Sequence, residues 1–405
     1  MFELVDVFYL AFTTISIYFV LLFLVIFFKK RKEMGDYEEA TRFPFVSIII
    51  PAHNEEKSIR RTVENLKKID YSNYEIIVVN DGSEDRTSQI AKKCGVKVID
   101  KKERTGKADS LNLGLKYAKG ELIAVVDADS FPKKDCLKKT VGQFQNPKVG
   151  AVTVTALVKN PRGLLQHMQE LEYAMIAWNR KLLDFINSIY VTPGTLSLYR
   201  RKLVLKLGGF DKKNMTEDIE MTWRVEKAGY IARMVFSTET YTIVPNELKR
   251  WFTQRIRWTI GGLQTLFKYK DVFLKRKYEM LGLFICPFFL LGFVLSLLAL
   301  GIFSSLYFSW GLKNLILFYQ AYYLGASVPV RLELLILPNV FTVFSVVIFV
   351  LSLLYVLICL KNLKINIMNL KNIFYIIFYL VIYLLTFPFI IVISLIRLWR
   401  GKYEW

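Results

Sequence analysis

The sequence contains few of the residues that build covalent cross-links or metal centres. Among its 405 residues there are four cysteines and two histidines. The cysteines lie far apart and form no CxxC or zinc-ligand spacing; they are Cys94, Cys136, Cys286 and Cys359. This distribution argues against a disulfide framework and against a zinc knuckle, and we expect reduced, buried thiols.

Long basic tracts are also missing away from the apolar runs, although the formal net charge is +20. Nucleic acid is therefore a poor candidate for a partner. Since 53% of the residues are hydrophobic and 15% are aromatic, the composition is typical of a membrane protein with a soluble part. We expect the positive charge on solvated faces near anionic membrane lipids, with attraction of phosphate-bearing substrates as the alternative. Nothing in the sequence identifies a protein partner.

Residues 7–28 form an apolar run long enough to span a bilayer, and four basic residues, 29–32, follow it directly. No basic residue precedes the run and no small-residue cleavage site follows it, which favours a retained anchor over a removable signal peptide. Because positive charges stay on the cytoplasmic side, we expect the N-terminus outside. Residues 1–42 are thus predicted as an anchor with a basic linker, and residues 43–246 as a cytosolic domain.

Three further apolar runs predict a C-terminal transmembrane region over residues 273–405; they are 279–307, 334–360 and 373–396. Three spans put the C-terminus outside, whereas Arg397, Arg400 and Lys402 favour the cytoplasm. Either the tail breaks the rule or the intermediate segment 312–330 also spans. The expected protein is a multi-pass protein of the plasma membrane.

The domain between the apolar runs has the pattern of an α/β fold. Short β-branched runs alternate with charged segments of helical length; the predicted strands are Val46–Ile50, Glu75–Asn80, Val96–Ile99 and Leu122–Val126. Such alternation predicts a parallel sheet covered on both faces. Ligands bind at the carboxyl ends of strands in these sheets, and here those ends carry PAHNEE, DGSEDRT and DADS.

Several polar residues at these strand ends could hold a nucleotide. Asp127 and Asp129 point to one side of an extended chain and make a hard oxygen site for Mg²⁺ or Mn²⁺ bridging a diphosphate, with a solvated turn as the alternative. Asp81 opens a turn in which Gly82 takes positive φ, and its carboxylate could also contact a base or ribose. Lys107 lies at a predicted helix start, where it is either a phosphate ligand or a solvated lysine.

The motifs PAHNEE, VNDGS, GKADSLNLGL, VVDADS, MTEDIEMTWRVEKAGY and QRIRW occur in this order. As an ordered set over about residues 44–262, they resemble the membrane-bound glycosyltransferase family 2 enzymes of the cellulose, hyaluronan, chitin and poly-N-acetylglucosamine synthase type. The resemblance implies a GT-A catalytic domain, a nucleotide-sugar donor that is usually uridine-linked, a divalent metal ion, and inversion at the anomeric carbon.

The resemblance also implies roles for single residues. The donor-site residues are expected to be Pro51, Ala52, Glu55, Asp81, Lys107, Asp127 and Arg257. Asp127 and Asp129 are expected to hold the diphosphate and its metal ion, with Asp129 the closer ligand. His53 stands where the family often has tyrosine and is expected to line the pocket, while His167 is expected to be structural.

Two segments are expected to carry the transfer itself. Asp218 in TED is the candidate base that takes the proton of the acceptor hydroxyl, with Glu217 in a supporting role. The alternative is that these acids only fill the first turn of a helix capped by Thr216. Gly194 in PGTLSLYRR resembles the glycine that floors the acceptor site, where the lack of a Cβ lets a sugar approach; the alternative is an ordinary turn.

Two amphipathic stretches, Leu164–Ile186 and Leu248–Lys270, have the pattern of helices in a membrane interface, with packing on the domain as the alternative. The second defines an interfacial helix over residues 247–272.

Helical spacing sorts the residues of this second helix. It puts Gln254, Arg257 and Trp258 on one face together with Trp251, and Gly261 continues that face with room for a ligand. Arg255 points elsewhere and is expected at the membrane. In the resembling synthases this face closes the active site: Trp258 stacks on the acceptor sugar, Arg257 reaches the diphosphate and Gln254 bonds nearby.

Three functions follow as hypotheses. The favoured one is a synthase that elongates a polysaccharide and exports it through its own helices. The second is a single sugar transfer to a lipid acceptor, as in ceramide glucosyltransferases with a similar (Q/R)xxRW motif; few spans and no clear FxVTRR loop leave it open. The third is a silent nucleotide-sugar sensor or transporter subunit, against which the intact DGS, DAD, TED and QRIRW set argues. The basic link 361–372 is either an interfacial helix or a loop. UDP-N-acetylglucosamine and UDP-glucose are weakly favoured as donors by family frequency.

Overall fold

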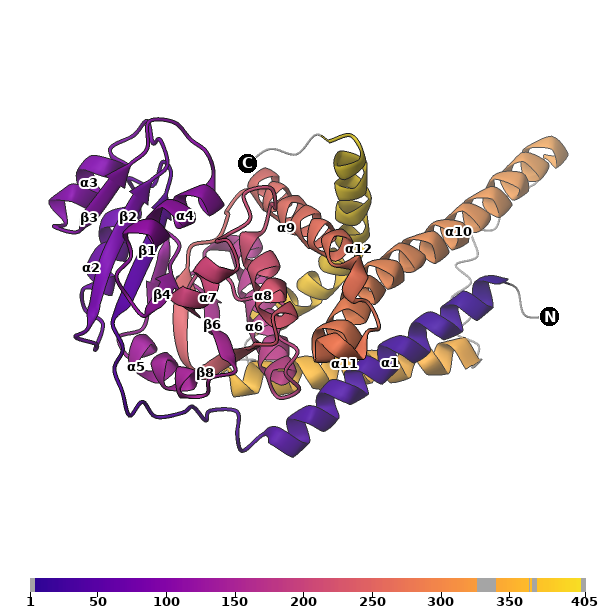
Figure 1. The fold of residues 1–405 in the computed structure, drawn as a ribbon. Coiled ribbons are helices and arrows are strands. Elements are labelled where there is room, and N and C mark those ends of the chain that lie inside the picture. Colours follow the sequence, from indigo (N-terminus) through magenta and orange to yellow (C-terminus); the bar gives the residue numbers. More distant parts are fainter. Residues whose placement is uncertain (1–3, 326–339, 364, 366–369, 402–405) are drawn as a thin grey trace.

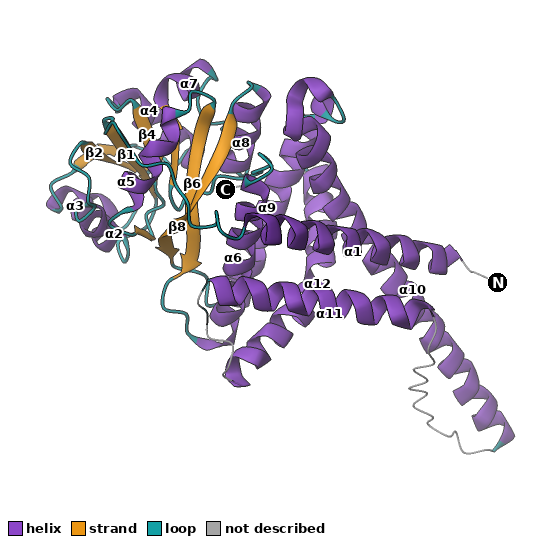
Figure 2. Ribbon diagram, turned by 90° about the horizontal axis from the view of Figure 1, so that it is seen from below, coloured by secondary structure: helices purple, strands orange, loops and turns teal. Residues whose placement is uncertain are grey.

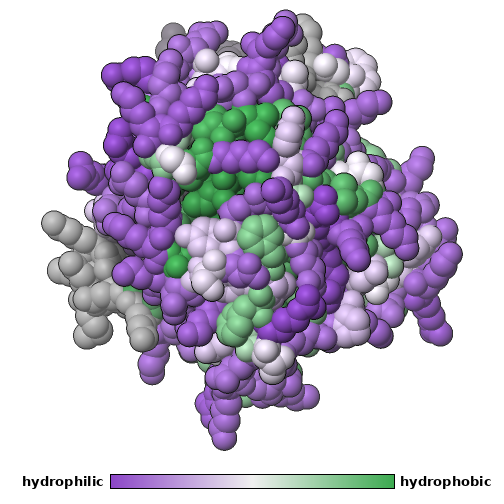
Figure 3. All heavy atoms as spheres, turned by 60° about the vertical axis from the view of Figure 1, so that its left-hand side comes forward, coloured by the Kyte–Doolittle hydropathy of each residue, from purple (hydrophilic) through white to green (hydrophobic). Residues whose placement is uncertain are grey.

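The computed structural model describes residues 4–325, 340–363, 365 and 370–401, and it shows an α/β unit beside a group of long helices (Figure 1). Hydrophilic side chains cover most of the face that the α/β unit presents in Figure 3, and hydrophobic side chains gather in a hollow between them. This distribution is that of a domain in water attached to apolar helices.

The α/β unit is built on one mixed sheet of eight strands in the order β3-β2-β1-β4-β7-β6-β8-β5. The strands are β1 (Val46–Ala52), β2 (Tyr74–Asn80), β3 (Lys97–Asp100), β4 (Leu122–Val125), β5 (Ser130–Pro132), β6 (Val149–Val158), β7 (Ser197–Arg200) and β8 (Ile231–Thr242). Strands β1 to β4 are parallel, as predicted. Strand β7 is antiparallel to both β4 and β6, so the expectation of a wholly parallel sheet is wrong beyond β4.

Helices cover the two faces of this sheet and connect it to the apolar region (Figure 2). The α-helices of the unit are α2 (Ile59–Leu66), α3 (Thr87–Lys93), α4 (Lys107–Tyr117), α5 (Cys136–Val141), α6 (Gly163–Asp184), α7 (Arg201–Lys206), α8 (Glu217–Lys227) and α9 (Leu248–Lys268). Short turns of other helical types are η1 (Gly142–Gln145), η2 (Lys270–Val272), η3 (Arg276–Tyr278) and the π-helical η4 (Leu281–Ile285).

The burial of β1 follows from the two-residue repeat of a strand. Ile48 and Ile50 point to one face and pack in a cluster with Val63 of α2. Ile49 points to the other face and packs in a second cluster with Leu111 of α4. All seven residues of β1 are buried, which is why its sequence is an apolar run and not an alternating one.

Among the described residues, four helices are long and apolar enough to cross a membrane. They are α1 (Leu4–Lys30), α10 (Cys286–Leu324, continuing η4), α11 (Val340–Asn362) and α12 (Leu370–Trp399). Helix α1 runs along α11, and α10 extends away from the rest of the molecule (Figures 1 and 2).

Helix α10 overturns one expectation about the membrane region. Its 39 residues make a rod about 58 Å long, well beyond the roughly 30 Å of a bilayer core. Residues 312–324 of the segment 312–330 continue α10, so they do not form a separate span. Residues 326–330, the start of the run 334–360, and residues 364 and 366–369 of the basic link 361–372 lie outside the described residues.

Both predicted amphipathic helices are present as α6 and α9, within two residues of the expected bounds. Helix α6 packs on β6 and β8 and also contacts α11 and α12, while α9 packs between α8 and α12. The two helices thus join the sheet to the membrane region, and packing on the domain, the stated alternative, is realised. A place in the membrane interface stays a prediction.

The four cysteines are all free thiols, as expected. Three of them are buried, and Cys94 at the end of α3 is half-buried.

Helix α8 carries an unusual buried acid, Glu226. Neither of its carboxylate oxygens has a hydrogen-bond partner within the described part of the chain. Burial raises the pKa of Glu226 well above its ordinary value because the charged form loses its hydration.

We expect Glu226→Gln to stabilise the protein at neutral pH by about 1–3 kcal/mol, since the buried glutamate must either take up a proton or carry an uncompensated charge there, and glutamine does neither. The folded wild type holds the Glu226 proton more tightly than the unfolded chain does. Its free energy of unfolding therefore falls as the pH rises above the ordinary glutamate pKa of about 4.3. The variant's advantage in melting temperature, measured between pH 8 and pH 5, should therefore shrink as the pH falls. Glu247→Gln, at an exposed glutamate, is the matched control. An advantage that is equal at every pH contradicts the assignment.

Candidate active site

A cavity of about 580 Å³ opens at the carboxyl ends of β1 and β4. Its walls come from the loops after these strands, from residues 193–195, and from α6, α8, α9, α10 and α12. Its size lies within the range of small-molecule sites in enzymes. Segments from the whole length of the chain therefore meet at one place.

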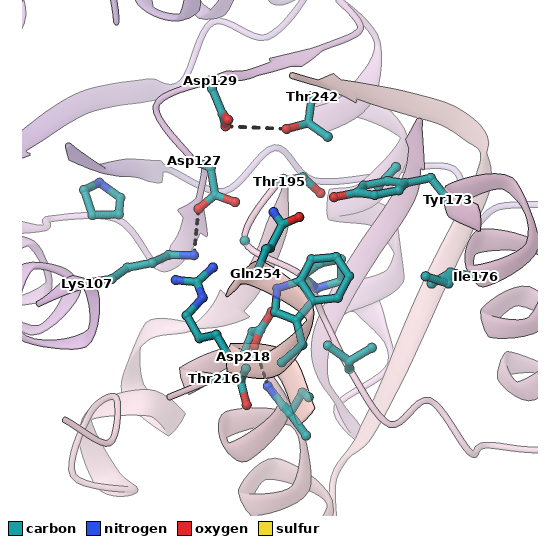
Figure 4. Close-up of a pocket in the computed structure, with 18 of the residues that line it drawn as sticks. Lys107, Asp127, Asp129, Tyr173, Ile176, Thr195, Thr216, Asp218, Thr242 and Gln254 are labelled. Atoms are coloured by element: carbon teal, nitrogen blue, oxygen red, sulfur yellow. Dashed lines mark hydrogen bonds and ion pairs between the residues drawn. The ribbon is translucent and has the colours of Figure 1, made fainter. Parts of the chain in front are cut away.

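The two carboxylates of the DAD motif both line this cavity. The backbone fixes them: Asp127 N–H donates to Gly194 O (2.8 Å), and Thr62 Oγ1 donates to the carbonyl of Ala128 between them (2.7 Å). In Figure 4, Asp127 and Asp129 lie on the same side of the cavity, with Thr242 beside Asp129. The strand end thus presents two acids in a set geometry.

The charges around Asp129 suit a cation. Burial, followed by repulsion from Asp127 and Glu55, raises the pKa of Asp129 to about 7. Within the described residues no group of three histidines, cysteines or acids forms a complete metal cage. Mg²⁺ and Mn²⁺ sites in nucleotide enzymes, however, commonly use one or two carboxylates together with substrate phosphates. The residues present fit such an ion.

Lys107 begins α4 and points into the same cavity. Its ammonium pairs with Asp127 (2.7 Å) and with Glu217 (2.8 Å). Burial alone would lower the pKa of Lys107, but the carboxylates of Asp127, Glu217 and Asp218 raise it above its ordinary value. Lys107 is therefore charged. Because its ammonium is paired with two carboxylates, it is not the solvated lysine that the sequence left open as the alternative.

Gly194 lies against this ion pair. A Cβ on Gly194 would come within 2.5 Å of Lys107 Nζ and 2.7 Å of Asp127 Oδ1. The glycine is thus needed so that the loop can approach the paired charges, which is a different reason from the expected approach of a sugar. Gly194 does line the cavity, and its contact with an acceptor stays a prediction.

Asp81 also lines the cavity, but its carboxylate is largely used within the protein. It pairs with Lys101 (2.5 Å) and accepts hydrogen bonds from the N–H groups of Thr105 (3.0 Å) and Gly106 (2.9 Å). Gly82 has φ of +60°, as predicted. Asp81 therefore fixes the loop that leads into Lys107, and contact with a nucleotide remains a prediction.

The TED segment forms the start of α8, with Thr216 as the residue before the helix. The threonine hydroxyl makes no capping hydrogen bond, so the side-chain cap that belonged to the alternative is not formed. Asp218 is half-buried and lines the cavity, whereas Glu217 is buried outside the lining and bonds Lys107. Burial, followed by repulsion from Glu217, raises the pKa of Asp218 to about 6.

Helix α9 presents Gln254, Arg257 and Trp258 to the cavity. In Figure 4, Gln254 lies between Asp127 and Asp218. Trp251 is not part of this lining: it is fully buried in an apolar cluster with Met168 and Ile390. The four residues were expected on one face, so that prediction is wrong for Trp251.

Arg255 does not reach the membrane, contrary to expectation. Its side chain is 3% exposed and forms a two-pronged pair with Glu172 of α6, in which Nε lies 2.7 Å from Oε1. Its guanidinium also lies 4.2 Å from the ring centroid of Trp258, and its Nη1 donates to Gln254 Oε1 (2.6 Å). The buried pair therefore holds two of the residues that face the cavity.

Gly261 leaves no room for a ligand, which corrects a further expectation. A Cβ at this position would come within 2.6 Å of Thr216 Cγ2 and 2.7 Å of Thr216 Cβ. The missing side chain lets α9 lie directly on the TED segment. Polar contacts strengthen this packing: Lys268 pairs with the fully buried Glu220 (2.6 Å), and Asn214 donates to Thr265 (2.9 Å).

Of the other predicted residues, Pro51, Ala52, His53 and Glu55 line the cavity. His167 does not, because its ring stacks on Tyr375 and bonds to Glu170.

Sequence reasoning missed the half of the lining that faces the apolar helices. The missed residues are Tyr173, Ile176, Arg180, Tyr190, Thr195, Phe289, Phe293 and Phe387. The one charged residue among them, Arg180, stands between Asn179 and Lys181, and nothing in the sequence distinguishes it from the other basic residues of an amphipathic helix.

Comparison with solved structures agrees with the fold described above. The structure is similar to that of mannosyltransferase PcManGT from Pyrobaculum calidifontis in complex with GDP-Man and Mn²⁺, with a TM-score of 0.57 and 21% identity over 86% of this chain and 99% of that chain. The fold is that of GT-A glycosyltransferases.

The sequence relatives define the family. Residues 47–208 match the model of "Glycosyl transferase family 2". The Bacillus subtilis (strain 168) protein named "Probable glycosyltransferase YdaM" is 35% identical over 310 residues, which are 71% of this chain and 73% of that one. The poly-beta-1,6-N-acetyl-D-glucosamine synthase of Staphylococcus aureus (strain COL) is 29% identical over 249 residues, and the chain spans 60% of its length. The chain belongs to glycosyltransferase family 2, as the motifs predicted.

We expect Glu172→Gln to destabilise the protein by about 3–5 kcal/mol, because it leaves the buried charge of Arg255 without its counterion. Thermal unfolding measures this loss, and sugar transfer should fall with it because Trp258 loses its support. Glu170→Gln, on the same helix with a half-exposed acid, is the control. The double variant Glu172→Gln/Arg255→Gln should regain part of the stability; equal instability of the single and double variants would show that the pair is not the stabilising unit.

Proposed function

We propose that this protein transfers a sugar from a UDP-linked donor to a hydroxyl of a growing polysaccharide, with inversion at the anomeric carbon. One observation carries the proposal: the DAD carboxylates, Asp218 and the face of Gln254, Arg257 and Trp258 line a single cavity. These are the parts needed to hold a diphosphate, to accept a proton and to stack on a sugar.

The donor occupies the side of the cavity at the strand ends. Asp127 and Asp129 would hold a divalent ion, Mg²⁺ or Mn²⁺, which would supply positive charge to the diphosphate. Pro51, Ala52 and Glu55 line the nucleotide side, and Arg257 faces the phosphates. A nucleotide-sugar donor agrees with the GDP-Man bound to the structural neighbour and with the poly-N-acetylglucosamine made by a sequence relative.

Transfer is a single displacement. The acceptor oxygen forms a bond to the anomeric carbon while the bond from that carbon to the diphosphate breaks, and the hydroxyl proton passes to Asp218. With a pKa of about 6, Asp218 is mostly ionised at neutral pH yet basic enough to accept the proton. Lys107, paired with Glu217, keeps a positive charge beside the departing diphosphate, and Trp258 stacks on the acceptor sugar.

We place the catalytic domain in the cytoplasm of a plasma-membrane protein, since nucleotide sugars are cytoplasmic substrates and the basic residues 29–32 follow α1. Export of the product through the helices of the chain, and the role of membrane lipids, stay predictions.

Asp218→Asn should lower the rate of transfer at least about 100-fold, because the amide cannot accept the proton. Binding of the donor, measured by calorimetry, should remain nearly unchanged. In the wild type the base is lost by protonation, so transfer should fall about tenfold per pH unit below about pH 6. Asp70→Asn, at an exposed acid, is the control. Turnover that is unchanged in Asp218→Asn would remove Asp218 from the mechanism.

The product distinguishes the candidate functions. We expect purified protein in lipid, given a panel of labelled nucleotide sugars, to make a ladder of products from a UDP-sugar on gel separation. A single lipid-linked sugar would support single transfer. Donor binding without any transfer would support a sensor, and preference for a GDP-sugar would contradict the proposed donor.

A further inference from the structure

Arg180 of α6 is a buried cation that the proposed chemistry leaves unused. The residue is 3% exposed and lines the cavity. Its Nε and Nη1 have no hydrogen-bond partner among residues 4–325, 340–363, 365 and 370–401. These nitrogens carry three N–H donors, and they belong to a side chain that lines the cavity.

Such an arrangement is costly for the protein alone. Burial lowers the pKa of Arg180, but a guanidinium stays protonated inside proteins, so the charge cannot be discarded. Other cations buried at α6 have carboxylate partners: Arg255 pairs with Glu172, and Lys181 with Asp184 (2.9 Å). Arg180 differs from both, and the difference indicates that its partner is a ligand.

The polar groups around Arg180 indicate in which part of the cavity it lies. Asp218, Tyr190 and Tyr173 act on its charge electrostatically, yet none of them bonds Nε or Nη1. The carboxylate of Asp218 is the proposed base. Arg180 therefore lies on the acceptor side, near the place where the acceptor hydroxyl must be.

The walls beside Arg180 are apolar and belong partly to membrane-crossing helices. Phe289 and Phe293 come from α10, and Phe387 comes from α12. Tyr190 packs against Phe289 with ring centroids 5.5 Å apart. Apolar surface next to a guanidinium suits a ligand with a hydrocarbon part and an anionic head.

We propose that Arg180 binds the phosphate of a membrane-lipid acceptor, whose hydroxyl receives the first sugar. The planar fork of a guanidinium matches two phosphate oxygens, and the phosphate charge neutralises the buried cation, which the hydroxyls of a neutral glycan would not do. The phenylalanines contact the hydrocarbon, and the hydroxyl lies toward Asp218. This inference rests on the proposed function and narrows its acceptor: the lipid is the primer on which the product starts.

The test compares acceptors in purified full-length protein. Phosphatidylglycerol offers a lipid-borne phosphate with free hydroxyls, glycerol 3-phosphate offers the same chemistry without the lipid, and dodecyl glucoside offers a neutral hydroxyl with an alkyl chain. We expect Arg180→Gln to raise the KM for phosphatidylglycerol about 10- to 100-fold, the loss of one to two charge-assisted hydrogen bonds. The KM for dodecyl glucoside and the rate of donor hydrolysis should change less than about twofold. Arg180→Lys keeps the charge but not the planar guanidinium, so its KM for phosphatidylglycerol should lie between those of the wild type and Arg180→Gln.

A matched control is Arg162→Gln, the same substitution at an exposed residue directly before α6, which should behave as wild type. Thermal unfolding separates binding from structure: Arg180→Gln should melt at or above the wild-type temperature, because an uncompensated charge is removed.

Several results overturn the inference. A lower melting temperature with equal loss on every acceptor would make Arg180 structural, and preference of the wild type for glycerol 3-phosphate would assign a soluble phosphate. Use of dodecyl glucoside alone, or an unchanged KM for phosphatidylglycerol in Arg180→Gln, would assign a neutral acceptor. Wild-type protein that neither hydrolyses a UDP-sugar nor transfers from it would instead contradict the proposed function itself.

Discussion

The ammonium group of Lys107 is the contact on which the geometry of the site depends. It joins Asp127 at the end of β4 to Glu217 at the start of α8, and Gly194 lies against both members of the first pair. Three segments separated by up to about a hundred residues are thereby held around one charge. The loop that delivers Lys107 is itself fixed by Asp81. The charged side chains of Lys107, Asp127 and Glu217 therefore hold one another in place, and this side of the cavity is a single electrostatic unit.

The opposite wall is built by helix packing instead. The missing side chain of Gly261 lets α9 lie on the TED segment. The buried Glu220 of α8 pairs with α9, and Glu172 of α6 pairs with Arg255 of α9, so α9 is fixed to both neighbouring helices. Gln254 and Trp258 therefore sit on a rigid element, as accurate positioning of reacting groups requires. The helices that make this wall also touch α11 and α12, so this side of the cavity is joined directly to the apolar helices.

Local sequence was sufficient for much of this picture. The β-branched runs predicted four strands because a parallel, doubly covered sheet needs apolar residues at every position, and the order of the motifs predicted the family. Strands β5 to β8 escaped prediction because their pairing joins distant segments, in parallel between β6 and β8 and in antiparallel at β5 and β7. Strand β7 has only four residues and is defined by its neighbours. Helical phasing put Arg255 off the face that lines the cavity, as the structure has it, but wrongly suggested the membrane as its surroundings. Phasing could not identify Glu172, 83 residues away, as its partner. The sequence also does not reveal what lies against a glycine: Gly261 was expected to leave room for a ligand, but Thr216 fills that space.

The distribution of the thiols allows the natural protein to be labelled with a fluorescent dye at one main position. Cys136, Cys286 and Cys359 are buried in the packed interior, whereas Cys94 is partly accessible at the end of α3, on the outer edge of the sheet. A maleimide dye should therefore react chiefly at one position of the natural sequence, away from the lining of the cavity. Such a single label can report changes around the sheet edge without any engineered residue.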